Sequence, residues 1–173
     1  MYIGNIENGY LEGLGIYRSI DGMKLYEGNW KQGLCHGKGI CFDEEYGDVK
    51  YEGTYNQGFK DGYGVSYYLN GLKKYEGFLS KEKKTGKGVY YSDNKHKIYD
   101  GEWNEDKREG FGKSYYPSGS IEYVGYWLND KKEGRGCEYH QNGMKKFFGF
   151  WKNGQKEGEG IAMRTNGTYG FLG

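Results

Sequence analysis

The sequence predicts an all-β protein, built as an elongated, single-layer solenoid of antiparallel β-hairpins. Three observations favour this fold: a motif that recurs with a nearly fixed period, glycines that keep fixed places within the motif, and an aromatic-rich composition. The chain has 173 residues, of which 18% are aromatic and 33 are glycine, with a single proline. Disordered chains are poor in aromatic residues, and a flexible glycine-rich linker has no reason to keep its glycines in register. We therefore expect an ordered chain whose core is built from rings.

The motif opens with an aromatic residue and a glycine two positions later, and a Gly-x-Gly begins nine residues after that glycine. The seven openings are Tyr2, Tyr26, Tyr51, Tyr75, Tyr99, Tyr123 and Phe147. Each unit is 24 residues long, except the second, which has one extra residue. A period of this length is typical of stacked supersecondary units, in contrast to one globular core. We expect a single array over residues 1–173, with a partial eighth unit from about residue 169.

The opening of each unit reads as a β-strand. In the fifth unit, alternation places Tyr99, Gly101 and Trp103 on one face, with Asp100 and Glu102 on the other. Since glycine has no side chain, the one between the two large residues is expected to leave room for a ring from the neighbouring strand.

A short turn, such as residues 31–33, follows the first strand, and a second strand is expected after the Gly-x-Gly. Glu82, Asp106 and Asp130 stand where other units have the turn glycine. A polar turn such as residues 70–71 then closes the unit. Each unit is therefore a two-stranded hairpin, which is marginal alone and stabilised by its neighbours. Because strands lie about 4.8 Å apart, each unit should add roughly 10 Å to the ribbon.

The string Tyr-Glu-Gly-x-Trp/Tyr, then Asn/Gln-Gly, then Gly-x-Gly-Val/Ile-x-Tyr resembles the MORN repeat (membrane occupation and recognition nexus). The resemblance covers residues 2–168 in seven consecutive copies. It implies a hairpin array that serves as a scaffold or adaptor in cytoskeletal, ciliary or membrane-junction settings. Some MORN proteins carry a kinase or methyltransferase domain beside the array, and this sequence has none. We expect no enzymatic activity, no catalytic residues, no cofactor and no small-molecule substrate.

An apolar cluster near the C-terminal end is the first candidate binding site. If residues such as Glu27 and Glu52 point outward, the same offsets place apolar side chains outward in later units. These are Phe78, Val124, Tyr126, Phe148 and Phe150. An exposed apolar cluster usually marks an interface, here for an extended peptide or helix of another protein, or for self-association. The other interpretation is packing under the C-terminal tail or against the remainder of a longer array.

A basic line along the turns suggests a second class of function, a peripheral membrane module. Its residues are expected to line one edge: Lys83, Lys84, Lys107, Arg108, Lys131 and Lys132. Each cation near an anionic bilayer contributes about 1 kcal/mol. Acidic residues such as Asp61, Glu109 and Glu133 lie close by and neutralise much of this charge, so a solvated edge is the favoured interpretation. Nucleic acid is not expected as a partner, because the formal net charge is only +1.

Metal binding is not expected either. Cys35, His36 and Cys41 lie close in sequence but lack a fourth ligand at metal-site spacing. The odd count of three cysteines suits a reducing compartment, and no apolar run approaches the roughly 18 residues of a spanning helix. We therefore expect a cytoplasmic protein, which the resemblance would associate with the cytoskeleton, a cilium or a membrane surface.

Overall fold

The computed structural model describes residues 1–165 and 168–171, which form β-strands and, within these ranges, no helix. This confirms the predicted all-β class. The strands are β1 (Tyr2–Glu7), β2 (Tyr10–Arg18), β3 (Lys24–Lys31), β4 (Leu34–Phe42), β5 (Val49–Asn56), β6 (Phe59–Tyr67), β7 (Lys73–Ser80), β8 (Lys83–Tyr91), β9 (Lys97–Asn104), β10 (Lys107–Tyr115), β11 (Ile121–Leu128), β12 (Lys131–Tyr139), β13 (Lys145–Lys152), β14 (Gln155–Met163) and β15 (Tyr169–Phe171).

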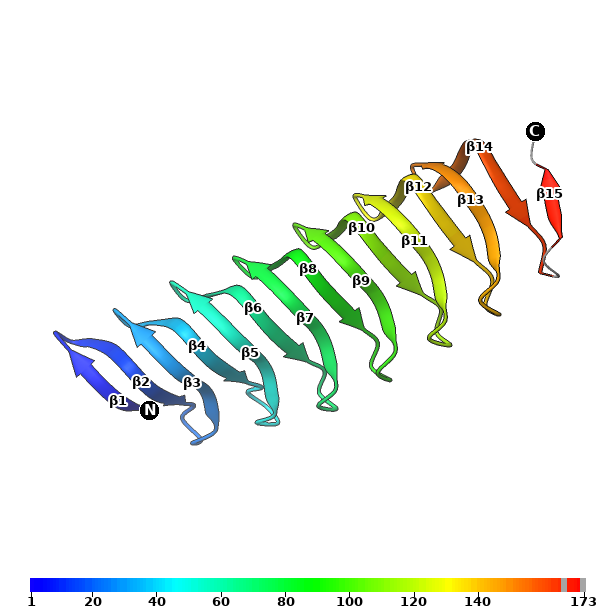
Figure 1. Ribbon diagram of the computed structural model, residues 1–173. Coiled ribbons are helices and arrows are strands. Elements are labelled where there is room, and N and C mark those ends of the chain that lie inside the picture. Colours follow the sequence, from blue (N-terminus) through cyan, green and yellow to red (C-terminus); the bar gives the residue numbers. More distant parts are fainter. Residues whose placement is uncertain (166–167, 172–173) are drawn as a thin grey trace. The chain divides into compact units, whose positions relative to one another are not determined.

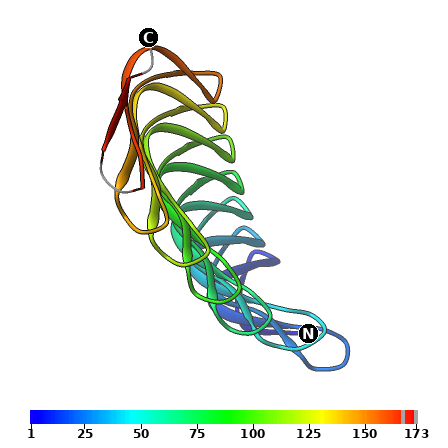
Figure 2. The ribbon, with the colours of Figure 1, turned by 90° about the vertical axis from the view of Figure 1, so that its right-hand side faces the viewer.

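The chain divides into two compact units, Met1–Lys83 and Lys84–Gly173. In the first unit, β1 to β7 follow one another in chain order, and each strand is antiparallel to the next. In the second unit, β8 to β15 repeat this arrangement. Within each unit the strands lie side by side in an open sheet (Figure 1). The strands also bow along their length, as the turned view makes plain (Figure 2).

One face of each sheet carries the core, which is almost entirely aromatic. The buried residues of the first unit are Tyr26, Trp30, Tyr51, Tyr55, Tyr75 and Leu79. Those of the second unit include Tyr99, Trp103, Tyr123, Trp127, Phe147 and Trp151. The rings meet edge to face, both within a strand and between neighbouring hairpins: Tyr123 lies 5.2 Å from Trp127 and 5.4 Å from Trp151 between ring centroids. Such pairs add about 0.5–1.5 kcal/mol each beyond the area they bury.

Two glycines of the motif, the one in the opening and the second of the Gly-x-Gly, leave room for these rings. The Tyr99 ring lies over Gly101 and Gly112, and a Cβ built on Gly112 would stand 2.2 Å from the Tyr99 Oη. The hydroxyl then donates a hydrogen bond to the Glu102 carbonyl oxygen at 3.1 Å. The expected ring over glycine is therefore present, but it belongs to the same strand as the first glycine. It reaches across to the glycine of the next strand because the two glycines are cross-strand partners.

The short turns have both central residues in the left-handed region. In the turn between β11 and β12, Asn129 has φ of 48° and Asp130 has φ of 66°. This matches the type I′ hairpin turn, whose twist suits paired strands. The Asp130 carboxylate accepts hydrogen bonds from the Arg108 backbone N at 2.9 Å and from its Nε at 3.1 Å. The acidic residues that replace the turn glycine thus tie each hairpin to the preceding one.

The second strand of each hairpin begins directly after this turn, earlier than the sequence predicted. Strand β12, for example, starts at Lys131 and contains the whole Gly134–Gly136 motif. Gly134 has a φ of 60°, and the pairing with β11 shifts register between Gly125 and Tyr126. The first glycine of the pair therefore forms a β-bulge inside a continuous strand, and does not end a loop.

Candidate binding surfaces on the open face

The surface opposite the aromatic core, here called the open face, carries the side chains that alternate with the core residues. In the second unit, direct cross-strand partners run from Lys113 to Val124, then to Cys137, Phe148 and finally Ile161. Four consecutive members of this row, from Val124 to Ile161, are apolar. The row crosses β11, β12, β13 and β14.

Four of the five predicted protein-binding residues lie together on this face. Val124 and Tyr126 come from β11, and Phe148 and Phe150 come from β13. Tyr126, Phe148 and Phe150 are 53%, 46% and 44% exposed, and Val124 is half-buried. Phe78 lies in the other unit, on β7, where it is exposed and packs against Tyr63 with 5.5 Å between ring centroids.

The structure adds residues to this surface that were not predicted from the sequence. Phe111 packs edge to face against Tyr126 with centroids 5.6 Å apart, and the Arg135 guanidinium lies 5.1 Å from the Phe150 ring centroid. Ile161 is 50% exposed beside Phe148. Phe111 and Arg135 are the middle residues of Gly-x-Gly motifs, which the sequence analysis placed before the second strand. We call Phe111, Val124, Tyr126, Phe148, Phe150 and Ile161 the C-terminal apolar face.

The open face of the first unit differs in shape and charge. It contains a hollow of about 600 Å³ over β2 to β6. Leu14, Ile40 and Val65 line the hollow together with the carboxylates of Glu27 and Glu52. This is a groove of mixed apolar and acidic character.

The predicted basic line is divided between the two faces, because adjacent residues of a strand point to opposite sides. Lys84, Arg108 and Lys132 turn toward the aromatic core. The Arg108 guanidinium lies 4.1 Å from the Trp127 ring centroid, and the Lys132 side chain, 15% exposed, lies 4.9 Å from that of Tyr123. Lys84 lies 4.8 Å from the Trp103 ring centroid and 3.2 Å from the Asp106 carboxylate. These three side chains stabilise the core through cation–π contacts.

The remaining members of the line are exposed at the beginnings of their strands. They are Lys83 in the first unit and Lys107 and Lys131 in the second. The expectation that all six cations line one edge is therefore wrong for the second unit. There, exposed cations stand at Lys107 and Lys131, while Lys84, Arg108 and Lys132 cover rings.

Lys132 also joins a cluster around a shielded carboxylate. Glu138 lies 3.5 Å from Lys132, 3.5 Å from Lys146 and 3.2 Å from Lys156. Burial of Glu138 opposes its ionisation, but the three ammonium groups outweigh burial and hold the pKa of this carboxyl below its usual range. Lys132 also lies 3.8 Å from Glu122, so two carboxylates hold these three lysines together on the core face.

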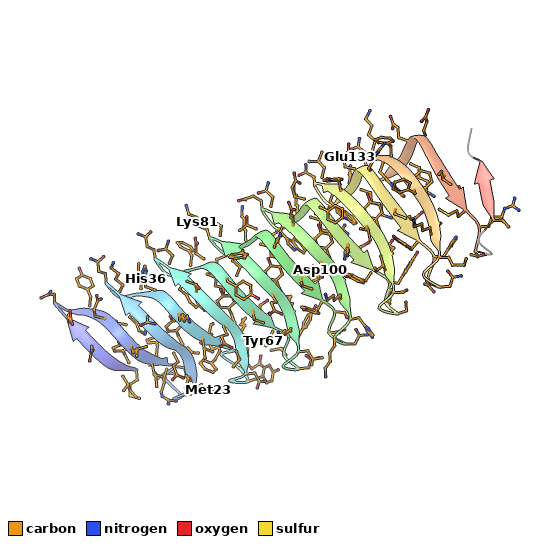
Figure 3. All side chains as sticks on the ribbon, in the orientation of Figure 1. Met23, His36, Tyr67, Lys81, Asp100 and Glu133 are labelled. Atoms are coloured by element: carbon orange, nitrogen blue, oxygen red, sulfur yellow. The ribbon has the colours of Figure 1, made fainter. Side chains whose placement is uncertain are left out.

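The acidic residues near the lysines have a structural role. Glu109 accepts a hydrogen bond from the Asn129 backbone N at 3.1 Å, and Glu133 accepts one from the Asn153 backbone N at 2.9 Å. In the first unit, Asp61 accepts one from the Lys81 backbone N at 3.3 Å. Each bond joins a strand to the turn of the following hairpin. Figure 3 shows Lys81 and Glu133 at the short-turn edge of their own units.

Residues 1–165 and 168–171 hold no group of three or more side chains arranged to bind a metal ion. Burial raises the pKa of the Cys35 thiol to about 11, so this cysteine is largely protonated at neutral pH. The part of the chain that the structure describes contains no helix able to cross a membrane.

Comparison with known families matches the geometry. The model of the MORN repeat matches the chain seven times in succession, at residues 2–24, 26–43, 51–73, 75–97, 99–121, 123–145 and 147–169. A comparison with curated protein sequences gives no significant match. Proteins built from this repeat are generally non-catalytic. The hairpin repeats and these seven matches together establish that the chain belongs to the MORN-repeat family.

Proposed function

We propose that this chain is a non-enzymatic scaffold or adaptor, and that it binds another protein along the open face through the C-terminal apolar face. The observation that carries the proposal is the unbroken apolar row from Val124 through Cys137 and Phe148 to Ile161. Exposed rings flank the row at Tyr126 and Phe150. Cys137 itself is buried, but Phe148 and Ile161 in the row are exposed, and an exposed apolar cluster of this kind typically marks an interaction site.

The repeats themselves supply an internal comparison. In the second unit, Asp100 and Glu102 occupy the positions that Val124 and Tyr126 occupy in the next repeat. The hairpin therefore forms with charged residues at these positions, and folding does not require apolar ones. The apolar side chains of the later repeats are better explained by a partner.

The shape of the partner follows from the surface. A paired sheet is rigid, and its rings lose little conformational freedom on binding, so a few aromatic anchors can dominate the affinity. An extended peptide or a helix with apolar side chains would fit such a row, and a second copy of the chain is the other candidate. The family resemblance suggests a cytoskeletal or ciliary assembly as the setting.

An anionic membrane is the alternative partner, through the exposed Lys83, Lys107 and Lys131. This alternative is less well supported, because Lys84, Arg108 and Lys132 are engaged with rings and carboxylates. Sedimentation with phosphoinositide-containing liposomes tests it. Binding that collapses at raised salt would favour lipid, since exposed charges are screened over about 8 Å at physiological ionic strength.

A quantitative pull-down from native lysate tests the main proposal. Phe148→Glu/Phe150→Glu should abolish capture of a specific partner while circular dichroism stays unchanged, because both side chains are exposed and the core is untouched. Met144→Glu serves as the matched control, since Met144 is similarly exposed at 40% but lies at a hairpin turn. Light scattering on the same variants separates a partner from self-association. An unchanged partner list and an unchanged mass in the double variant would contradict the proposal.

A further inference from the structure

We propose that the groove on the open face of the first unit is a second binding site, for a basic segment in the polyproline II conformation that carries Lys or Arg at every third position. This goes beyond the proposed function, because it concerns a different unit and a ligand of opposite chemical character. Three features support this proposal: a hollow, a periodic row of carboxylates, and the spacing between successive carboxylates.

The groove has the volume and lining of a peptide site. Its hollow of about 600 Å³ is lined by the apolar side chains of Leu14, Ile40 and Val65 and by the Tyr63 ring. The Tyr63 hydroxyl donates a hydrogen bond to the Glu76 carboxylate at 3.0 Å, which holds Glu76, on β7, next to the end of the hollow that Tyr63 lines. Aromatic and aliphatic side chains beside convergent polar groups are typical of peptide-binding grooves.

Carboxylates and apolar side chains alternate across β2 to β7, and the middle four members of this row, from Glu27 to Val65, line the hollow. The cross-strand partners, in order, are Ile16, Glu27, Ile40, Glu52, Val65 and Glu76. Neighbouring strands lie about 4.8 Å apart, so the carboxylates recur about every 9.6 Å along the groove. Between each pair of carboxylates lies one branched apolar side chain.

This spacing selects the conformation of the ligand. A polyproline II helix has three residues per turn and rises about 3.1 Å per residue, so every third side chain points the same way about 9.3 Å apart. A flat β-strand places residues three apart on opposite faces. An α-helix repeats its face after two turns, about 10.8 Å, and drifts out of register with the carboxylates. Polyproline II therefore matches the groove best.

The charge of the row favours a cationic ligand. Glu52 makes no ion pair or side-chain hydrogen bond with any residue that the structure describes. Glu27 pairs with Lys24 at 2.7 Å and Glu76 with Lys73 at 2.9 Å, and both pairs are partly exposed. Exposed pairs of this kind are weak and exchange readily. Lys38 also lines the hollow, two positions along the strand from Ile40 and outside the carboxylate row.

Fluorescence anisotropy with two synthetic peptides tests this proposal. The first repeats Arg-Pro-Pro through about four turns of polyproline II, and the second has the same composition with its arginines contiguous. The periodic peptide should bind the wild-type chain, and Glu27→Gln/Glu52→Gln/Glu76→Gln should weaken binding by about tenfold. The contiguous peptide should bind more weakly than the periodic one, because only one or two of its arginines can meet carboxylates.

The control variant removes the same charge elsewhere in the first unit. Glu7→Gln/Asp21→Asn/Glu44→Gln changes three exposed residues that do not line the groove, and it should leave binding within about twofold of wild type. Phe148→Glu/Phe150→Glu should also bind the peptide normally, so a failure of this site and a failure of the C-terminal apolar face are distinguishable. The proposal is overturned if the periodic peptide does not bind, if it binds the groove variant as tightly as wild type, or if both peptides bind equally.

Discussion

At the scale of single residues, the fold depends on an exchange between rings and glycines. The hydroxyl end of the Tyr99 ring lies close over two glycine backbones, and the hydroxyl donates a hydrogen bond to the Glu102 carbonyl oxygen. These two glycines, Gly101 and Gly112, are therefore required because the Tyr99 side chain approaches their backbones closely. Neither has a left-handed backbone conformation that would itself require glycine. This explains how a chain with modest aliphatic content builds a packed core.

Gly112→Ala tests this arrangement. The added methyl group would overlap the Tyr99 ring, so we expect the free energy of unfolding to fall by about 2–3 kcal/mol. Gly158→Ala is the matched control: it has a φ of 64° but no neighbouring atom within 4 Å, so strain alone should cost about 1 kcal/mol. Urea denaturation measures both. Equal losses for the two variants would show that ring contact is not the reason for the glycine.

The turn acids give a second prediction at this scale. Asp130 has a strained left-handed backbone, and its carboxylate accepts hydrogen bonds that offset this strain. The donors are the Arg108 backbone N at 2.9 Å and the Arg108 Nε at 3.1 Å. Asp130→Ala loses the bonds and keeps the strain, whereas Asp130→Gly loses the bonds and relieves the strain. The free energy of unfolding should therefore be about 1 kcal/mol lower for the alanine variant than for the glycine variant. A glycine variant less stable than the alanine variant in urea denaturation would refute this account.

At the scale of elements, each hairpin is held to its neighbours by rings on one face and by turn hydrogen bonds at one edge. The Glu133 carboxylate reaches the Asn153 backbone N of the next turn, and the Asp130 carboxylate reaches back to Arg108. Successive hairpins are thus linked in both directions. Stability in such arrays is approximately a sum of repeat and neighbour terms.

The hairpins of the first unit should lose stability in alkali. Burial raises the pKa of Cys35 to about 11 and that of Tyr51 to about 12, from ordinary values of 9.0 and 10.0. Both groups are neutral when protonated, so the folded state binds their protons more tightly than the unfolded state. Their contribution is fully present below pH 9 and is lost as the pH rises through 11 to 12. The urea midpoint should fall over this window, and a midpoint unchanged between pH 9 and 11 would contradict the prediction.

Most strands, and the face on which each side chain lies, could be predicted from the sequence, because period-two alternation decides which residues of a strand share a face. Tyr99 and Trp103 were placed together in the core, and Tyr126 and Phe148 on the opposite face. The beginning of each second strand was predicted too late in the sequence. The first glycine of the Gly-x-Gly, such as Gly134, is typical of a loop, but in the structure it forms a bulge inside the strand. Because of that error, Phe111 and Arg135 were not predicted to lie on a strand of the open face. The same error misplaced Lys84, Arg108 and Lys132, because these residues already belong to the strand and alternation turns them toward the core.

At the scale of the whole molecule, the same type of repeat forms two chemically different open faces. The first unit presents carboxylates and branched side chains around a groove, and the second presents a continuous apolar row. Neither pattern is needed by the hairpin, since both occur on the same backbone. We interpret the difference as two binding surfaces of different chemistry on one scaffold.

The most direct test of the central claim is site-specific photo-crosslinking. A benzophenone side chain is placed at position 148 on the C-terminal apolar face, and in a separate variant at position 144 on the hairpin turn. The account predicts that position 148 forms a covalent adduct with a single defined protein in native lysate, while position 144 does not. Equal crosslinking from both positions, or adducts from position 144 alone, would contradict the claim that this face is the binding surface.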